Sequence, residues 1–336
     1  MAKITIEEAT DTLLQLFLRA GITEERASRL ADLYVLASRD GVYSHGLHFV
    51  PHLLRALERK TIHDPNTDPV TIASFGAIER CDGLHGLGPL NAQWCMNRAI
   101  ALAQSHGIGC VALRNTNHWG RAGNVGWQAA ETGHPAICWT NTVANQPPWG
   151  SSTIAIGNNP LVLATPGPNG EHMVLDIAMS QFSMGRLNTH RLTGEPLPVV
   201  GGVDKHQKPT RDAAAILEGG HAWPMGYWKG SGLTILLDAL AAILADGNTT
   251  AEITAKQRGD HDVSQVYIAF APTKLGGRPA AERTEALIRD FAEKCPDARY
   301  PGQAALQKRQ QSIREGIWVD DSIWHDLKSK TSRSDQ

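Results

Sequence analysis

The stretch GPLNAQWCMNRAIALAQSHGIGCVALRN, residues 88–115, decides the fold class because it joins a helical pattern to a buried strand. Pro89 suits the first turn of a helix, and Gly107 suits the end of one. The run that follows, 108–115, is apolar over most of its length, which is typical of a buried strand. A helix that leads directly into such a strand predicts a mixed α/β core.

The chain before this stretch is expected to be helical. Thr5 to Glu8 has the form of a capping box before an apolar-periodic run that ends at Gly21. A second helix is expected between Thr23 and Gly41, with acidic residues in its first turn. Pro51 suits the first turn of a third helix.

Strands and helices alternate after this stretch and just before it. We expect strands at 70–81, 135–142, 159–166, 172–179 and 265–272, and helices at 123–133, 228–247 and 278–295. The helix at 228–247 is apolar nearly all round and is therefore expected to be buried. No G-x-G-x-x-G fingerprint lies between a strand and a helix, so any nucleotide is expected to bind without a Rossmann motif.

The overall composition is that of a soluble globular protein. The 336 residues are 42% hydrophobic and 20% charged, with a formal net charge of −2. Like charges gather only in the short C-terminal tail, which argues against nucleic acid or an anionic membrane as the main partner. No secretory signal is recognised, and no apolar run approaches the roughly 18 residues that span a bilayer. Five cysteines without a C-x-x-C pair indicate reduced thiols, so a cytoplasmic protein is expected.

His45 is the first candidate for chemistry. It follows the helix that ends at Gly41 and stands between Ser44 and Gly46, where glycine permits a conformation that a β-carbon would resist. A histidine on such a turn could be a surface or capping residue. It could also face a cleft and deliver a proton near neutral pH, as a general acid does.

His48 and His52 raise the alternative of a metal site. They are four residues apart, a spacing that places two zinc ligands on one helix face. The glutamate of an H-E-x-x-H motif is missing, and Pro51 makes one regular helix through both residues doubtful. We therefore expect no metal, and a zinc-dependent hydrolase or lyase stays as an alternative of another class.

Three further groups could carry chemistry. His118 and Arg121 follow the buried strand at its C-terminal end, where α/β sheets place ligands, although they could also form a polar turn. Asp176 interrupts an apolar run, and it could orient an imidazole, accept from a cofactor hydroxyl or be satisfied by backbone amides. Trp228 and Lys229 precede a Gly/Ser-rich helix entry, which favours phosphate.

Eight segments together point to one family. In chain order they are GVYSHG, HGIGCVALRNTNHW, GWQAAETG, ICWTN, PPWG, IGNNPL, MGYWKGSG and GIWVDDSIW, between residues 41 and 324. On these segments the chain resembles the type-2 malate/L-lactate dehydrogenase family of NAD(P)-dependent oxidoreductases. The resemblance implies a homodimer with a mixed α/β, non-Rossmann fold. It also implies four parts: a helical part at 1–65, an α/β segment at 66–120 that packs with the C-terminal part, a mixed-sheet NAD-binding domain at 121–270, and a helical segment at 271–336 that returns to the first part.

The resemblance also implies roles for individual residues. His45 becomes the proton donor to the substrate carbonyl, while Ser44 and His118 line the substrate pocket. We add the hypothesis that Asp176 controls the protonation state of the donor. Contacts with the nicotinamide dinucleotide are implied for His172, Met173, Val174, Leu175, Asp176, Ile177, Ala178, Trp228, Lys229, Gly302, Gln303 and Ala304.

One departure from the family concerns substrate recognition. Relatives often carry an arginine four residues after the histidine, and here that position is Phe49. An aromatic ring cannot replace a bidentate guanidinium. Recognition of a substrate carboxylate is therefore expected from His48 or Arg121, unless the substrate differs.

The resemblance implies a reductase of a 2-oxo or 2,3-dioxo sugar acid that uses NADH, with NADPH as the alternative. The specific reaction expected is reduction of 2,3-diketo-L-gulonate to 3-keto-L-gulonate, with hydride from the nicotinamide and the proton from His45. A malate, lactate or ureidoglycolate dehydrogenase and a cyclic-imine reductase are alternatives within the family. A non-catalytic binding protein that has kept the fold is a third class.

Overall fold

The structure is a computed structural model that describes residues 2–332. Its N-terminal helices are α1 (Ile6–Arg19), α2 (Glu24–Arg39) and α3 (Val50–Glu58), as expected. The Thr5 hydroxyl accepts a hydrogen bond from the Glu8 amide at 3.0 Å, which caps α1. Two short 3-10 turns, η1 (Tyr43–His45) and η2 (Leu47–Phe49), separate α2 from α3.

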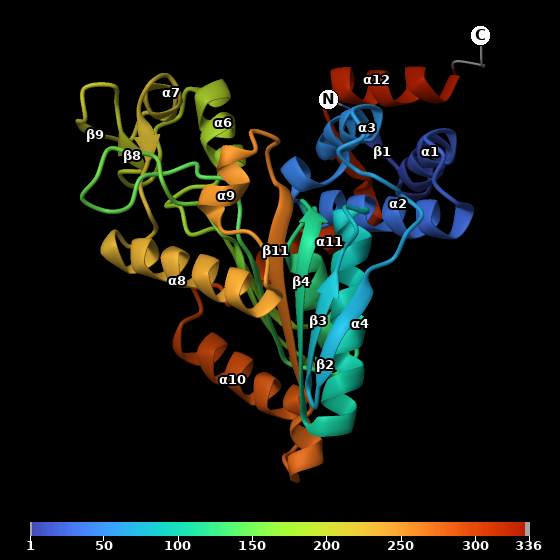
Figure 1. Ribbon diagram of the computed structural model, residues 1–336. Coiled ribbons are helices and arrows are strands. Elements are labelled where there is room, and N and C mark those ends of the chain that lie inside the picture. The colour runs from blue at the N-terminus through green and yellow to red at the C-terminus, as the bar shows by residue number, and fades with distance from the viewer. Residues whose placement is uncertain (1, 333–336) are drawn as a thin grey trace.

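A seven-stranded sheet forms the centre of the molecule, in the order β2-β3-β4-β11-β5-β6-β7 (Figure 1). The strands are β2 (Val70–Phe75), β3 (Ile78–Asp82), β4 (Ile108–Asn117), β5 (Ala136–Thr140), β6 (Leu161–Thr165), β7 (Met173–Ile177) and β11 (His261–Phe270). Only β3 and β4 run parallel, and every other neighbouring pair is antiparallel. The sheet is therefore mixed, as predicted.

One strand prediction is wrong. The run at 70–81 was expected to form a single strand, but it folds into the hairpin of β2 and β3. Gly76, between them, has a φ of +57°, a left-handed conformation that suits glycine and allows the tight turn.

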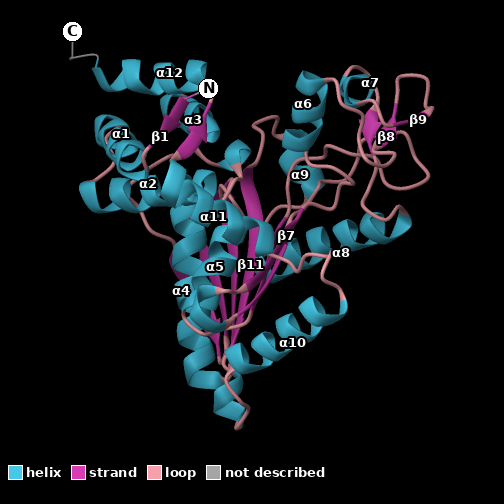
Figure 2. Ribbon diagram, turned by 180° about the vertical axis from the view of Figure 1, so that it is seen from behind, coloured by secondary structure: helices cyan, strands magenta, loops and turns pink. Residues whose placement is uncertain are grey.

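Helices cover both faces of the sheet. The helices α4 (Gly88–His106) and α5 (Gly123–Glu131) lie on one face, and α8 (Trp228–Ala245) lies on the other (Figures 1 and 2). The α4 helix is the crossover that the parallel pair β3 and β4 requires. Buried Met96 and Ala99 of α4 share a core with Val111, Leu113 and other residues of the sheet.

The prediction that the helix at 228–247 is buried is wrong for its outer face. Leu237 and Ala241 of α8 pack in the core beneath it. In contrast, Leu236 is 61% exposed and Ile243 is 68% exposed. By length and composition this helix is also apolar enough to cross a membrane, contrary to the expectation from the sequence, although core helices of soluble proteins meet the same criterion.

The C-terminal segment returns to the N-terminal helices. The strand β12 (Ile317–Val319) pairs with β1 (Ala2–Ile4), and α12 (Asp321–Ser332) follows it beside α1. Strands from both sides of residue 120 share the central sheet. The four-part division at residues 65, 120 and 270 remains a proposal.

The remaining elements surround this framework. They are α6 (Met184–Thr193), β8 (Gly202–Val203), β9 (Pro209–Thr210), α7 (Ala213–Leu217), β10 (His221–Ala222), α9 (Thr250–Ala255), α10 (Ala280–Lys294), α11 (Gln303–Glu315), and the 3-10 turns η3 (Pro168–Gly170) and η4 (Pro272–Leu275). The five cysteines are free thiols, as expected, and only Cys295 is exposed.

Candidate active site

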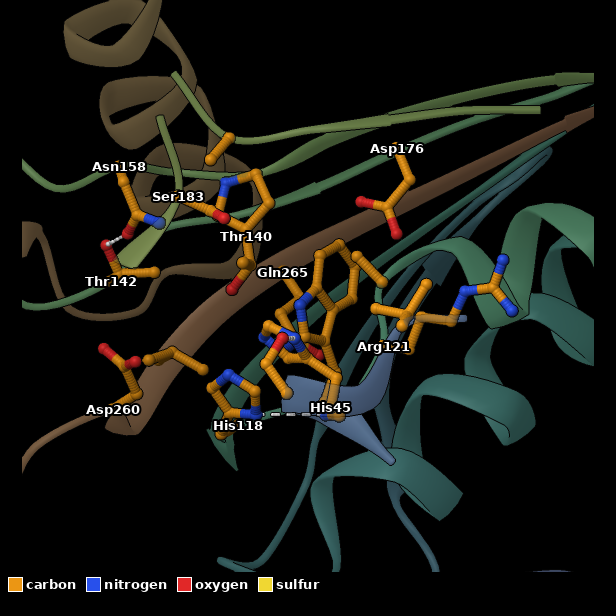
Figure 3. A pocket seen from close by; sticks show the side chains of 18 of the residues that line it. His45, His118, Arg121, Thr140, Thr142, Asn158, Asp176, Ser183, Asp260 and Gln265 are labelled. Atoms are coloured by element: carbon orange, nitrogen blue, oxygen red, sulfur yellow. Dashed lines mark hydrogen bonds between the residues drawn. The ribbon is translucent and has the colours of Figure 1, made fainter. Parts of the chain in front are cut away.

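A cavity of about 360 Å³ opens near one end of the central sheet (Figure 3). Segments far apart in the chain build its wall. They include the η1 turn, the loop after β4, the ends of β5 and β7, the start of β11 and the loop before α11. Its polar lining residues include Ser44, His45, His118, Arg121, Thr140, Asn141, Thr142, Asn158, Asp176, Ser183, Asp260 and Gln265.

His45 lies in this cavity on the η1 turn. Its Nδ1 is 2.9 Å from the hydroxyl oxygen of Ser44, and its ring stacks on His118 with 5.6 Å between centroids. Gly46 allows the turn to approach α2, because a Cβ at this position would come within 2.0 Å of the Ser38 hydroxyl oxygen. The Ser38 hydroxyl in turn accepts a hydrogen bond from the Leu47 amide at 2.8 Å.

The surroundings of the His45 and His118 rings favour the neutral form of each imidazole. Burial lowers the pKa of His45, the charge of Asp176 opposes this, and the charge of Arg121 lowers the pKa further, so the net shift is downward. Burial and the neighbouring His45 lower the pKa of His118 to about 3. The Gly120 amide donates to Nδ1 of His118 at 3.1 Å, so this nitrogen is the acceptor of the ring.

Asp176 faces the cavity from β7, and its Oδ2 accepts a hydrogen bond from the Gly123 amide at 2.7 Å. Successive side chains of a strand point to opposite faces. Val174, Asp176 and Ala178 line the cavity, whereas Met173 and Leu175 line a separate apolar cavity.

Several residues of the expected cofactor segments lie outside the cavity wall. The ring of His172 accepts at Nδ1 from the Gly167 amide, at 2.9 Å. Gly302 lines the cavity, but Gln303 and Ala304 do not, and neither does Ile177.

Trp228 and Lys229 also stand apart from the wall, at the start of α8. Trp228 is exposed, and Tyr227 before it has a φ of +62°.

Arg121 reaches the cavity, but its guanidinium is held elsewhere. Its Nη1 donates to Oδ2 of buried Asp40 at 2.7 Å, and Arg309 donates to both oxygens of the same carboxylate at 2.8 and 3.0 Å. Figure 3 shows the Arg121 guanidinium pointing away from the other labelled residues. Its expected role in binding a substrate carboxylate stays a prediction.

His48 does not line the cavity. Its ring stacks on Trp318, with 5.2 Å between centroids, and meets the ring of Tyr43 edge-on. Phe49 instead packs against His118, at 4.7 Å between centroids. The substrate role expected for His48 is likewise a prediction that no contact in the described cavity supports.

Seven polar residues of the wall were not identified from the sequence: Thr140, Asn141, Thr142, Asn158, Ser183, Asp260 and Gln265. Gln265 lies in β11 and Asp260 directly precedes this strand, and a double register shift of the strand's start against β4 interrupts the regular alternation of side chains. The only signal was a glutamine at the head of an apolar strand run. In residues 2–332 no three His, Cys, Asp or Glu side chains are grouped as ligands for a metal ion.

Comparison with known proteins gives the class of this fold and site. A sequence model of malate/L-lactate dehydrogenases matches residues 4–328, and the chain belongs to this family. The family consists of nicotinamide-dependent oxidoreductases that act on small hydroxy or oxo acids, which confirms the expected enzyme class.

Individual relatives agree with this membership. The chain is 42% identical over 328 residues to 2,3-diketo-L-gulonate reductase from Citrobacter koseri, covering 96% of this chain and 98% of the relative. Its fold is similar to Δ1-piperideine-2-carboxylate reductase from Pseudomonas syringae, with a TM-score of 0.87, 28% identity and coverage of 98% and 100%. Its fold is also similar to sulfolactate dehydrogenase from Methanocaldococcus jannaschii, with a TM-score of 0.86 and 27% identity. This match covers 98% of the present chain and 96% of the dehydrogenase. The expected family and fold class are confirmed.

Proposed function

We propose that this chain is an NADH-dependent reductase that converts 2,3-diketo-L-gulonate to 3-keto-L-gulonate. In the opposite direction the same reaction oxidises 3-keto-L-gulonate, also called 3-dehydro-L-gulonate, at C2. One observation carries the proposal: His45 shares a single cavity with Val174, Asp176 and Gly302, which come from the segments expected to bind the cofactor. The name of the 42% identical relative supports the choice of substrate.

The residues around the cavity suit a nicotinamide ring. Val174 of β7 and Ala178 just after this strand provide an apolar wall. Gly302 has a φ of +94°, and a Cβ there would lie 3.0 Å from the Val174 amide nitrogen, so glycine keeps the backbone close and the wall flat. When bound, the reduced nicotinamide would supply the hydride.

Polar side chains of the same cavity would handle the proton. The Ser44 hydroxyl holds Nδ1 of His45, which leaves Nε2 to protonate the oxygen of the reduced carbonyl. The negative charge of Asp176 favours the protonated imidazole before transfer. Neutral His118 packs against the His45 ring and adds no competing positive charge.

Cofactor choice, assembly and location belong to the same proposal. NADH in preference to NADPH, a homodimer and a cytoplasmic location are supported by the family resemblance alone. A zinc-dependent hydrolase would need His48 beside His45, but the ring of His48 packs against Trp318 instead.

Absorbance at 340 nm, followed with a panel of 2-oxo and 2,3-dioxo acids and both cofactors, tests the proposal. We expect 2,3-diketo-L-gulonate with NADH to give the highest kcat/KM. A higher value with oxaloacetate, pyruvate, the oxo acid that corresponds to ureidoglycolate or, added to the panel, a cyclic imine would assign a different member of the family. Chelator-sensitive hydrolysis without any nucleotide would overturn the enzyme class.

A further inference from the structure

Gln265 lines the cavity and carries a buried side-chain donor that has no acceptor in the described part of the chain. The residue lies within β11, lines the cavity and has 0% exposure. Its Oε1 accepts a hydrogen bond from the Tyr267 hydroxyl at 2.6 Å, which orients the carboxamide. Its Nε2 has no hydrogen-bond partner within residues 2–332. A buried N–H without an acceptor costs free energy, so a ligand oxygen that reached it would remove this cost.

Asp260 presents an acceptor to the same cavity. Its Oδ1 accepts from the Val143 amide at 2.9 Å, and no hydrogen bond to Oδ2 is found in the described part of the chain. Burial raises the pKa of this carboxyl, although the Val143 amide opposes the shift. Figure 3 shows Asp260 on the His118 side of the cavity, away from Asp176.

The pairing of a free donor with a free acceptor points to a hydroxyl-bearing ligand. A hydroxyl group both donates and accepts, so the hydroxyls of a ligand suit both the Nε2 donor of Gln265 and the Oδ2 acceptor of Asp260. A second carboxylate on the ligand would meet the acidic Asp260, and Arg121, the arginine that lines the described cavity, is held by Asp40. This wall therefore suits a polyhydroxylated chain better than a dicarboxylic acid.

We propose that Gln265 and Asp260 are specificity residues, which bind hydroxyl groups of the substrate tail and select sugar acids over short or dicarboxylic oxo acids. This inference rests on the proposed function, because it takes the β7 side as the cofactor side. Neither residue takes part in the transfer of hydride or proton.

The test compares Gln265→Met and Asp260→Asn with the native protein. For each we would measure kcat/KM for 2,3-diketo-L-gulonate, pyruvate and oxaloacetate at saturating NADH, and the KM for NADH. We expect the ratio of kcat/KM for 2,3-diketo-L-gulonate over pyruvate to fall by about 10- to 100-fold in both variants. Asp260→Asn should also raise the kcat/KM for oxaloacetate relative to pyruvate.

Gln146→Met is the matched control. Gln146 is 1% exposed and also has an unpartnered buried atom, Oε1, but it does not line the cavity. Its substitution should leave the substrate ratio unchanged. Asp260→Asn keeps an acceptor for the Val143 amide and should therefore fold. It tests the inference even where Gln265→Met does not fold.

The outcomes separate this inference from the proposed function. A native protein that reduces no oxo acid would overturn both. Native reduction of 2,3-diketo-L-gulonate with an unchanged ratio in both variants would overturn the inference alone. A higher KM for NADH in Gln265→Met, with the ratio intact, would place Gln265 on the cofactor side and also overturn it.

Discussion

Two charged neighbours act in opposite directions on the imidazole of His45. Asp176 raises its pKa and Arg121 lowers it, while burial lowers it most. The donor is therefore mainly neutral at pH 7. In the proposed mechanism reduction consumes a proton from this ring, so kcat/KM for reduction should fall as the pH rises through the pKa of His45, below its usual value of 6.5.

Replacing His45 by Gln should remove the proton donor and keep a side chain of similar size. We expect kcat for reduction to fall by about 10²- to 10⁴-fold, with NADH binding by fluorescence retained. His52→Gln, on the exposed side of the Phe49 ring, is the control and should stay active. Near-native turnover of the His45 variant would show that another group donates the proton.

Asp176→Asn should change the pH dependence of the reaction. The amide oxygen can still accept from the Gly123 amide, but the charge that raises the pKa of His45 is gone. The descending limb of the kcat/KM profile for reduction should therefore move to lower pH. A pH profile with an unchanged midpoint would contradict the role of Asp176 in controlling the donor.

Asp40 joins three segments around the η1 turn that carries His45. It caps α2 just before η1, and it binds Arg121 from the loop after β4 and Arg309 from α11. Arg309 also lies over the Trp127 ring, 4.3 Å from its centroid. Because α11 begins directly after Gly302, this ion-pair network connects the His45 turn to the proposed cofactor side of the cavity.

Asp40→Asn should destabilise the fold by about 3–5 kcal/mol, because it leaves buried arginines without their counter-charge. Thermal or urea unfolding at pH 7 measures this loss. Asp326→Asn breaks the exposed pair with Lys330 and should cost less than about 1 kcal/mol. Equal effects of the two substitutions would contradict a special role for the Asp40 network.

The same carboxylate makes stability depend on acid pH. Burial alone would raise the pKa of Asp40, but Arg309, Arg121 and Arg39 together lower it to about 2 from 3.8. A lowered folded pKa means that Asp40 contributes its full stability above the unfolded value, and that this stability is lost as the pH falls through about 2. The loss of folding stability that comes from protonation of Asp40, between about pH 4 and 2, should be absent in Asp40→Asn.

The exposed face of α8 bears on the assembly of the whole molecule. Leu236 and Ile243 are large apolar side chains that water contacts in a single chain. They are seven residues apart on one helix and so share a face, and exposed apolar side chains grouped on one face are typical of an interface. We expect a second copy of the chain to cover it in the proposed homodimer.

The double substitution Leu236→Glu and Ile243→Glu should therefore convert the dimer to monomers. Sedimentation velocity at micromolar concentration compares this double variant with the native protein. Leu275→Glu is the control, because Leu275 is 83% exposed but belongs to η4 and not to α8. A native monomer, or a double variant that stays dimeric, would contradict this assembly.

Local sequence patterns predicted most helices and strands correctly, but they predicted the packing between these elements less well. The helix and strand of residues 88–115 form as α4 and β4, since their periodicity and end signals are local. The hairpin at Gly76 was missed because every residue of β2 is exposed, so no alternation of buried and exposed positions marks where this strand ends. The outer face of α8 was misjudged because apolar composition does not say what packs against it.

The sequence by itself determined the family, the mixed α/β class and the position of His45 on a turn, because each depends on the identity and spacing of residues within short segments. Only the tertiary structure decided that β11 lies between β4 and β5, which brings Asp260 and Gln265 into the cavity that holds His45. It also decided that the Arg121 guanidinium binds Asp40. These arrangements depend on strand pairing and packing between segments far apart in the chain, which no local period of apolar residues reports.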